Sequence, residues 1–293
     1  MSPTTRTDPA TAYLRRLDLD PDLPPTLETL ELLHHRHLDR VPYENLSIML
    51  GRPPSVAAAD CVARVADVGR AGYCFHQNAA LGAGLQALGF EVSRRHGHVW
   101  TAPEHRGGSE LNHLVLVVSG LPTPDNPSGL WWPDAGLGEG FRSPMPLVVG
   151  DHEDGGFRYR IDRIDGAGAE GWSFTHAAGG TFRGIEVTPR TTAPADVAAA
   201  HRVLSTPPDG SFTRLLVVQR RLDRHYDSLR GCVLSRHEPD GHSQIDVTSY
   251  DDWRGALADE LHLPIGDVPE AELRLLWTRM RGAHEAWVTA GRP

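Results

Sequence analysis

The sequence predicts an α+β protein built from three consecutive segments. Residues 1–92 show helical spacing of apolar side chains, residues 93–195 break into short β-rich runs, and residues 196–293 mix the two patterns. At 293 residues the chain is also longer than one typical hydrophobic core serves. We therefore expect a mostly helical segment, a compact β-sheet or barrel and a mixed α/β segment, with boundaries near 92 and 195.

The first segment predicts three helices. Thr26 follows two prolines and is a typical N-cap, and Pro42 ends the helix that starts there. A second helix is expected over 55–68, and a third from Cys74 to Leu88, closed by Gly89. The leucines that recur at helical spacing in the first of these helices are Leu27, Leu30, Leu33 and Leu38.

The pattern changes to strands after the third helix. Short runs rich in β-branched and aromatic residues, separated by Gly, Pro and Asp, predict strands at 92–100, 114–118, 157–164 and 181–187. The last segment predicts, in order, a helix, two strands and a closing helix. These elements are expected at 195–204, 215–220, 232–235 and 270–287.

Composition excludes several classes of function. The net charge of −9 argues against a nucleic-acid or anionic membrane surface, which needs a basic patch. No apolar stretch approaches the ~20 residues of a membrane span, and the first residues lack the apolar core of a secretory signal. We expect a cytoplasmic protein. Its three cysteines are an odd number and indicate thiols rather than a disulfide framework.

The segment RAGYCFHQN, residues 70–78, carries the first chemical signal. Gly72 allows the backbone to turn just before Cys74, where a helix is predicted to begin. A cysteine at a helix start is stabilised as the thiolate, which is the nucleophilic form, by the helix dipole and unpaired N–H groups. The alternative is that Cys74 is a small buried apolar residue.

A base and an orienting acid are available further along the chain. NHLVLVV places His113 at the head of an apolar strand, and GLWWPDAGLGEG places Asp134 at a strand end before a glycine-rich turn. Cys74 would be the nucleophile, His113 its proton partner and Asp134 the group that orients the imidazole. With 16 histidines in the chain, this spacing alone is a weak argument.

Several separated motifs together resemble the arylamine N-acetyltransferase family over nearly the whole chain. RAGYCFHQN resembles its nucleophile motif, and NHLVLVV and PDAGLG resemble its histidine and aspartate motifs. PTLETLELLHHRH with VPYENLSIMLGR, and STPPDGSFTRLLVVQRR, resemble its N-terminal signature and the start of its third domain. The resemblance implies an N-terminal helical bundle, a central β-barrel and a C-terminal α/β lid around a catalytic core like that of cysteine proteases.

The resemblance also implies a reaction and a set of site residues. Acetyl-coenzyme A acylates Cys74, and an arylamine, hydrazine or hydroxylamine then takes the acetyl group, with no tightly bound cofactor and no metal. His113 and Asp134 fall on the family's catalytic triad. The implied substrate-binding residues are Tyr43 near the acceptor, Val99 and Phe212 as apolar walls, and Gly136, Leu137 and Gly138 as the turn that the donor approaches.

Three residues depart from the family motifs. Ala71 replaces a glycine, Tyr43 stands where the family commonly has Phe, and His76 replaces a glutamate two residues after the nucleophile. An unperturbed imidazole titrates near pH 6.5, so we expect His76 to make acylation sensitive to mildly acidic pH.

Other patterns have plainer interpretations. GAGAEG, residues 166–171, matches a dinucleotide-binding motif but lies between two predicted strands and is expected to be a hairpin loop. The histidine cluster at 34–37 is expected to be a solvated helix end rather than a metal site. Arg70 and Glu44 are either a buried ion pair that braces the active-site loop or two solvated charges.

Three other functions stay open from the sequence. An amide synthase of the same fold would take a long polyketide-type acyl chain from a carrier protein. A thiol hydrolase or transglutaminase-like enzyme shares the Cys, His, Asp order, although the motifs outside the triad speak against it. A non-catalytic binding protein would have no need of an intact triad.

Overall fold

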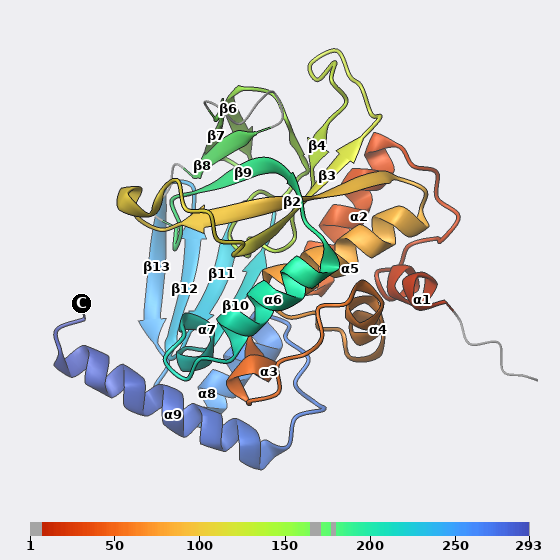
Figure 1. Ribbon diagram of the computed structural model, residues 1–293. Coiled ribbons are helices and arrows are strands. Elements are labelled where there is room, and N and C mark those ends of the chain that lie inside the picture. Colours follow the sequence, from red (N-terminus) through yellow and green to blue (C-terminus); the bar gives the residue numbers. More distant parts are fainter. Residues whose placement is uncertain (1–7, 165–170, 177–179, 293) are drawn as a thin grey trace, which may run out of the picture.

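The computed structural model describes residues 8–164, 171–176 and 180–292 and has a mixed α+β architecture. Helices gather in the first ninety residues, strands dominate the middle, and the last third combines both (Figure 1). The helices of the first third are α1 (Pro9–Arg16), α2 (Leu27–Arg40), α3 (Leu46–Met49), α4 (Ala58–Val68) and α5 (Cys74–Ala87). Those that follow are η1 (Pro103–His105), α6 (Pro194–Ser205), α7 (Ser211–Arg214), α8 (Tyr250–Gly255), η2 (Ala256–Glu260) and α9 (Glu270–Thr289).

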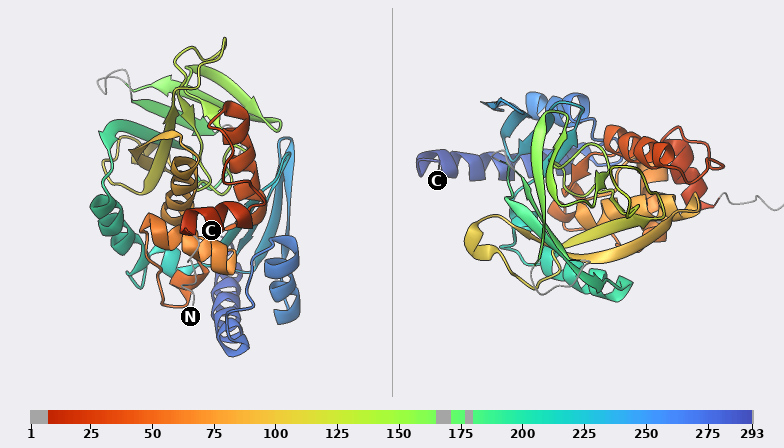
Figure 2. Two further views of the ribbon diagram at one scale, coloured as in Figure 1. Left: turned by 90° about the vertical axis from the view of Figure 1, so that its right-hand side faces the viewer. Right: turned by 90° about the horizontal axis from the view of Figure 1, so that it is seen from above.

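The strands form two antiparallel sheets, and the larger one curls into a half-barrel (Figure 2). Its eight strands have the order β5-β4-β3-β2-β9-β8-β7-β6, and the second sheet has the order β1-β10-β11-β12-β13. The larger sheet contains β2 (Glu91–Trp100), β3 (His113–Ser119), β4 (Trp131–Trp132), β5 (Met145–Pro146), β6 (Gly150–Asp154), β7 (Phe157–Arg163), β8 (Trp172–His176) and β9 (Gly184–Thr191). The second contains β1 (Tyr43–Glu44), β10 (Val217–Arg221), β11 (Tyr226–Arg230), β12 (Val233–Glu238) and β13 (Gly241–Asp246).

The predicted elements are confirmed in type and order. Thr26 caps α2 by accepting a hydrogen bond from the Thr29 N–H, and Gly89 follows α5 with a φ of +86°. Several edges differ by up to four residues: α4 begins at Ala58, and β9 runs from Gly184 to Thr191. The sequence missed α1, the short helices α3, α7 and α8, and the strands β1, β5, β6, β11 and β13, whose patterns are too brief to show a period. The GAGAEG prediction falls outside the described residues, apart from Gly171.

Helix α5 is the central element of the first segment. Nearly all of its residues are buried, because small side chains let its neighbours approach from every side. A Cβ at Gly84 would lie 2.4 Å from a ring carbon of Tyr13 in α1, and one at Gly82 would lie 3.2 Å from Leu116 in β3. This packing fixes the first residue of α5, Cys74, relative to the large sheet.

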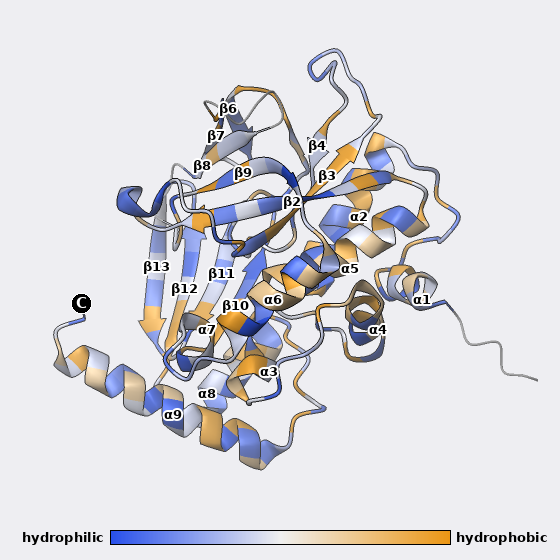
Figure 3. Cartoon of the chain, viewed as in Figure 1, coloured by the Kyte–Doolittle hydropathy of each residue, from blue (hydrophilic) through white to orange (hydrophobic). Residues whose placement is uncertain are grey.

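Strand β3 is buried on both faces, which explains its uninterrupted apolar sequence. Leu116 and Val118 pack with the helices of the first segment, whereas Val115 and Val117 face the aromatic core inside the half-barrel. Figure 3 colours this strand as one of the most hydrophobic parts of the chain. The strand therefore joins the helical core to the sheet core and holds His113 at its first position.

The second sheet is covered by α9, whose buried face carries Leu273, Leu276, Trp277 and Met280. Hydrophobic and hydrophilic residues alternate along this helix in Figure 3, as expected for one that packs on one side only. Among the described residues, no helix is both long and apolar enough to cross a membrane. The cytoplasmic location stays a prediction.

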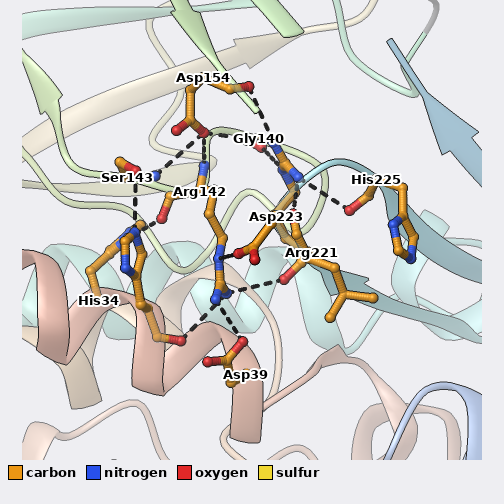
Figure 4. A network of polar contacts seen from close by, with 11 residues as sticks. His34, Asp39, Gly140, Arg142, Ser143, Asp154, Arg221, Asp223 and His225 are labelled. Atoms are coloured by element: carbon orange, nitrogen blue, oxygen red, sulfur yellow. Dashed lines mark hydrogen bonds and ion pairs between the residues drawn. The ribbon is translucent and has the colours of Figure 1, made fainter. Parts of the chain in front are cut away.

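A polar network around Arg142 ties the half-barrel to the helices and to the second sheet (Figure 4). The Arg142 guanidinium contacts Asp39 of α2 at 2.7 Å, Asp223 at 3.0 Å and the Arg221 carbonyl at 3.4 Å. Its side chain is only 9% exposed. These contacts make Arg142 a structural link between parts of the chain that are far apart in sequence.

We expect Arg142→Met to lower the free energy of unfolding by about 2 kcal/mol, because several hydrogen bonds to a largely buried guanidinium are lost. The matched control is Arg160→Met. Arg160 also contacts two carboxylates, but its side chain is 51% exposed, so the cost should stay within about 0.5 kcal/mol. Urea unfolding followed by circular dichroism measures both. Equal midpoints for the two variants would contradict the structural role of Arg142.

Candidate active site

Cys74 occupies the first position of α5, as predicted. Gly72 has a φ of +134°, in the region that favours glycine, and a Cβ there would lie 2.5 Å from His76 Nδ1. No side chain caps the start of α5, so main-chain N–H groups of its first turn stay available beside the thiol. Cys74 Sγ lies 3.6 Å from the Asn112 carbonyl, and Cys74 is 4% exposed.

The backbone approaches Cys74 closely on its other side. A Cβ at Gly136 would lie 2.8 Å from the Cys74 Cα and 2.9 Å from the Cys74 carbonyl oxygen. Only a glycine lets the turn after Asp134 pass this close to the cysteine.

His113 and Asp134 form a buried pair next to Cys74. His113 Nε2 lies 2.8 Å from Asp134 Oδ2, and Cys74 lies close enough to the ring to act on its pKa. Since Asp134 occupies Nε2, the nitrogen left for Cys74 is Nδ1. Burial disfavours the charged ring, but the carboxylate of Asp134 and the side chain of Cys74 outweigh it and raise the pKa of His113 to about 10. The arrangement therefore favours an imidazolium at His113.

Four donors surround the Asp134 carboxylate. Oδ2 accepts from His113 and from the Trp132 indole N–H at 2.9 Å. Oδ1 accepts from the Asn78 amide at 2.8 Å and from the Gly136 N–H at 2.9 Å. Hydrogen bonds of this kind hold a carboxylate in the ionised form and fix its plane.

His34 and Asn78 hold the main chain of this loop, and the sequence did not point to either role. His34 Nε2 accepts from the Asp134 N–H at 3.0 Å, so its Nδ1 carries the proton and donates to the Arg142 carbonyl at 2.8 Å. Burial lowers the pKa of His34 to about 3 and keeps the ring neutral. Asn78 accepts from the Ala135 N–H at 3.0 Å.

The predicted solvated helix end at 34–37 is therefore wrong. His34 and His37 are fully buried. His37 bonds to Tyr13 and to Gln77, and Gln77 donates in turn to the Gly72 carbonyl at 3.1 Å. Tertiary packing, which helix periodicity cannot indicate, turns these polar residues inward. Among the described residues, no group of three or more His, Cys, Asp or Glu is placed to hold a metal.

A cavity of about 360 Å³ opens onto the thiol. Cys74 and His113 line it together with five of the six predicted substrate-binding residues: Tyr43, Val99, Gly136, Leu137 and Phe212. Gly138 does not line it, but lies against two residues that do. A Cβ at Gly138 would lie 2.1 Å from Gln219 Oε1 and 3.3 Å from Tyr43. The sequence missed other lining residues: Thr101, Asn112, Thr181, Phe182, Leu204, Ser211, Val217, Gln219 and Arg230.

Glu139 holds part of the cavity wall from behind. Its carboxylate accepts from the hydroxyl of Thr181 at 2.9 Å, from the Phe182 N–H at 3.2 Å and from the Gln219 amide at 3.2 Å. Burial raises the pKa of this carboxyl group. One buried acid thus fixes three residues that face the substrate. The sequence feature that could have pointed to this role is that Glu139 is the one charged residue in the glycine-rich turn GLGEG.

The other two cysteines have different surroundings. Burial raises the pKa of Cys61 to about 12 and that of Cys232 to about 11. Both side chains are buried and neither lines the cavity. Both thiols are therefore expected to be unreactive at neutral pH.

The prediction for His76 assumed that its imidazole titrates near pH 6.5, and this assumption is wrong. His76 Nε2 donates to the Pro54 carbonyl at 3.1 Å, and the ring packs against those of Tyr73 and His201. Burial lowers the pKa of His76 to about 3. The ring is therefore neutral over the range in which we expected it to titrate, because burial removes the water that stabilises an imidazolium.

Both interpretations of Arg70 and Glu44 are also wrong. Each residue is buried, yet they do not pair with one another. Arg70 contacts Asp267 and the Pro264 carbonyl, each at 2.7 Å, and so ties the active-site loop to the C-terminal segment. Glu44 accepts from the Leu46 N–H and lies 4.0 Å from Arg64. Arg70 does brace the active-site loop through an ion pair, but its partner is Asp267, which lies 197 residues further along the chain.

A Cys, His, Asp set whose cysteine and histidine line a cavity defines the class of enzymes that act through a cysteine nucleophile. A sequence profile described as N-acetyltransferase matches residues 26–268. The arylamine N-acetyltransferase of Mycolicibacterium smegmatis is 30% identical over 267 residues, which cover 87% of this chain and 92% of that protein.

Solved structures agree with the sequence comparison. The arylamine N-acetyltransferase of Mycobacterium abscessus superposes with a TM-score of 0.79 at 26% identity, covering 93% of this chain and 94% of that one. The Mycobacterium marinum enzyme in complex with CoA has a TM-score of 0.79 at 25% identity, with coverages of 92% and 98%. The chain belongs to the arylamine N-acetyltransferase family.

We expect Asp134→Asn to lose about 10³–10⁴-fold of the acylation rate. In either orientation of the amide, its NH₂ group must face two of the four donors around Asp134. The amide also carries no charge to balance an imidazolium at His113, and in the orientation that turns its NH₂ toward His113 it offers that ring no acceptor. Asp125→Asn, a substitution at an exposed position, is the matched control and should act like wild type. Rapid-quench measurement of thioester consumption tests this. A near-normal rate in Asp134→Asn would make Asp134 a structural residue only.

We expect His76→Gln to leave the pH dependence of Cys74 alkylation by iodoacetamide unchanged between about pH 5 and pH 8, since His76 stays neutral there. Glutamine can still donate to the Pro54 carbonyl. His113→Gln serves as the positive control and should change the profile. A shift of the wild-type profile on replacing His76 would mean that its ring titrates beside the thiol.

Proposed function

We propose that the protein transfers an acetyl group from acetyl-coenzyme A to an arylamine, hydrazine or hydroxylamine through a thioester on Cys74. The contact between His113 and Asp134, beside a cavity that Cys74 and His113 line, is the observation that carries the proposal. A related enzyme from Mycobacterium marinum has been solved with CoA, which supports this donor. Acetyl-coenzyme A is a co-substrate, and free coenzyme A leaves after the first step.

In the first half-reaction, the Cys74 thiolate attacks the carbonyl carbon of the donor thioester. The carbon–sulfur bond to coenzyme A breaks, and His113 gives its proton to the departing thiolate. The main-chain N–H groups at the uncapped start of α5 are suited to stabilise the oxyanion that forms in between.

In the second half-reaction, the amine attacks the carbonyl carbon of acetyl-Cys74. His113 takes a proton from the amine nitrogen, the carbon–sulfur bond to Cys74 breaks, and the resting thiolate–imidazolium pair is restored. Asp134 balances the charge on His113 in both steps and keeps Nε2 occupied. The first step exchanges one thioester for another, so acetyl-Cys74 stays reactive toward both amines and water. Positioning of the amine in the cavity therefore has to favour its attack over that of water.

We also infer that the three segments, 1–92, 93–195 and 196–293, act as helical bundle, β-barrel and lid around a core like that of cysteine proteases. The first two segments supply the nucleophile and its partners, in support of this division. Pairing of β1 with β10 and the contact between Arg70 and Asp267 tie the third segment to the first. No observation in the described residues favours the amide-synthase, carrier-protein or hydrolase alternatives.

We expect acetyl-coenzyme A to add one acetyl group to the protein, on Cys74. Cys61 and Cys232 should stay unmodified, because burial raises the pKa of both thiols. Intact-protein mass spectrometry and peptide mapping after a short incubation measure this, with Cys74→Ala and Cys61→Ala as matched variants. Acetylation that survives in Cys74→Ala would refute the proposed intermediate.

Steady-state kinetics should give parallel double-reciprocal lines when the donor is varied at several amine concentrations, since one nucleophile serves both half-reactions. Converging lines together with no isolable acetyl-enzyme would indicate direct transfer in a ternary complex.

A further inference from the structure

One cation in the active-site cavity has no part in the reaction as described. Arg230, the last residue of β11, is the only arginine among the described residues that line the cavity, and the chain contains no lysine. Its guanidinium makes no hydrogen bond or ion pair within the part of the chain that the structure describes. Among the described residues that line the cavity there is no carboxylate, and the acid on which Arg230 acts, Glu139, lies behind the wall. The walls therefore present one positive charge and no negative charge to whatever binds there.

The charge acts on the site. Burial raises the pKa of Tyr43 and of Glu139, and Arg230 opposes that shift at both groups. Tyr43 lines the cavity, and Glu139 holds three of its wall residues. Apolar neighbours such as Phe212, Leu204 and Val217 reduce screening by water, so the field of Arg230 extends into the cavity.

Arg230 and the thiol lie at different depths. Cys74 and His113 are only 4% and 2% exposed, whereas Arg230, which lines the same cavity, is exposed to solvent. A substrate whose reacting atom lies at Cys74 Sγ must extend its other end toward the opening, where an anionic group would meet the guanidinium.

The size of the cavity distinguishes the two substrates as sources of that anion. A sphere of 360 Å³ is roughly 9 Å across. In coenzyme A about thirteen bonds separate the sulfur from the nearest phosphate, a reach of about 15 Å when extended. The donor phosphates therefore lie beyond the cavity when the thioester is at Cys74. In a one-ring amine, a carboxylate opposite the nitrogen is about 6 Å away and stays inside.

We propose that Arg230 is an anion subsite that selects aromatic amines carrying a carboxylate across the ring from the nucleophilic nitrogen. The inference rests on the proposed function and adds a preference among its acceptors. A planar carboxylate matches the two parallel N–H donors of a guanidinium, which is the geometry of the strongest arginine contacts.

The test separates the second half-reaction from the first. Acetyl-enzyme is made with acetyl-coenzyme A and freed of donor. Loss of its acetyl group is then followed with 4-aminobenzoate and with the uncharged 4-aminobenzamide. Wild type is compared with Arg230→Gln, with Arg230→Lys, and with Arg224→Gln. Arg224 is exposed in the turn that precedes β11 and does not line the cavity, so its variant controls for the lost charge.

We expect Arg230→Gln to slow the reaction with 4-aminobenzoate about tenfold and to leave that with 4-aminobenzamide unchanged. Arg230→Lys should keep part of the preference, and Arg224→Gln should keep all of it. The ratio between the two amines should also fall with added salt, because the guanidinium is partly in water.

Two results would overturn the proposal. If Arg230→Gln changed the rate of acetyl transfer equally for both amines, or for neither, Arg230 would have no role in selecting the acceptor. Slower acylation by acetyl-coenzyme A but not by S-acetyl-pantetheine, with the amine ratio unchanged, would assign the charge to the donor phosphates. A wild-type protein that never forms acetyl-enzyme would instead refute the proposed function itself.

Discussion

The active site depends on the placement of one carboxylate. Asp134 is buried and receives four hydrogen bonds, from β3, β4, α5 and the turn that follows it. A buried carboxylate is stable as an ion only when its oxygens are matched in this way. The negative charge of Asp134 raises the pKa of His113, and His113 lies beside Cys74 in the wall of the cavity. The remaining interactions of the site hold this chain of three in place.

The fold supplies that placement through contacts between distant segments. His34 in α2 fixes the Asp134 N–H and binds the carbonyl of Arg142, whose guanidinium joins α2 to the second sheet. On the other side, Arg70 links the loop before Cys74 to Asp267. A loss of packing far from the cavity would therefore reach the catalytic residues through these links, and activity is expected to fall with partial loosening of the structure.

Short-range sequence patterns were enough to predict the helices and the strand on which the site is built. A cap at Thr26, a glycine turn before Cys74 and an apolar run after His113 are short-range signals, and the structure has α2, α5 and β3 where they predict them. The sequence did not predict the roles of His34 and Glu139 or the ion-pair partner of Arg70. Their contacts span 100, 42 and 197 residues of sequence, respectively. Burial of a polar group by such contacts also reversed the expectations for the histidines at 34–37 and for His76. Chain periodicity contains no information about which distant donor will match a buried acceptor.

The protonation state of the His113 ring tests the account most directly. Nitrogen-15 NMR of histidine-labelled protein, with His113 assigned by the signals missing in His113→Gln, reports whether one or both ring nitrogens carry a proton. A folded-state pKa raised above its unfolded value keeps the imidazolium below about pH 10 and loses it above. We predict a doubly protonated ring at about pH 8. A neutral His113 at that pH, with a titration near 6.5, would contradict the proposed chain from Asp134 to Cys74.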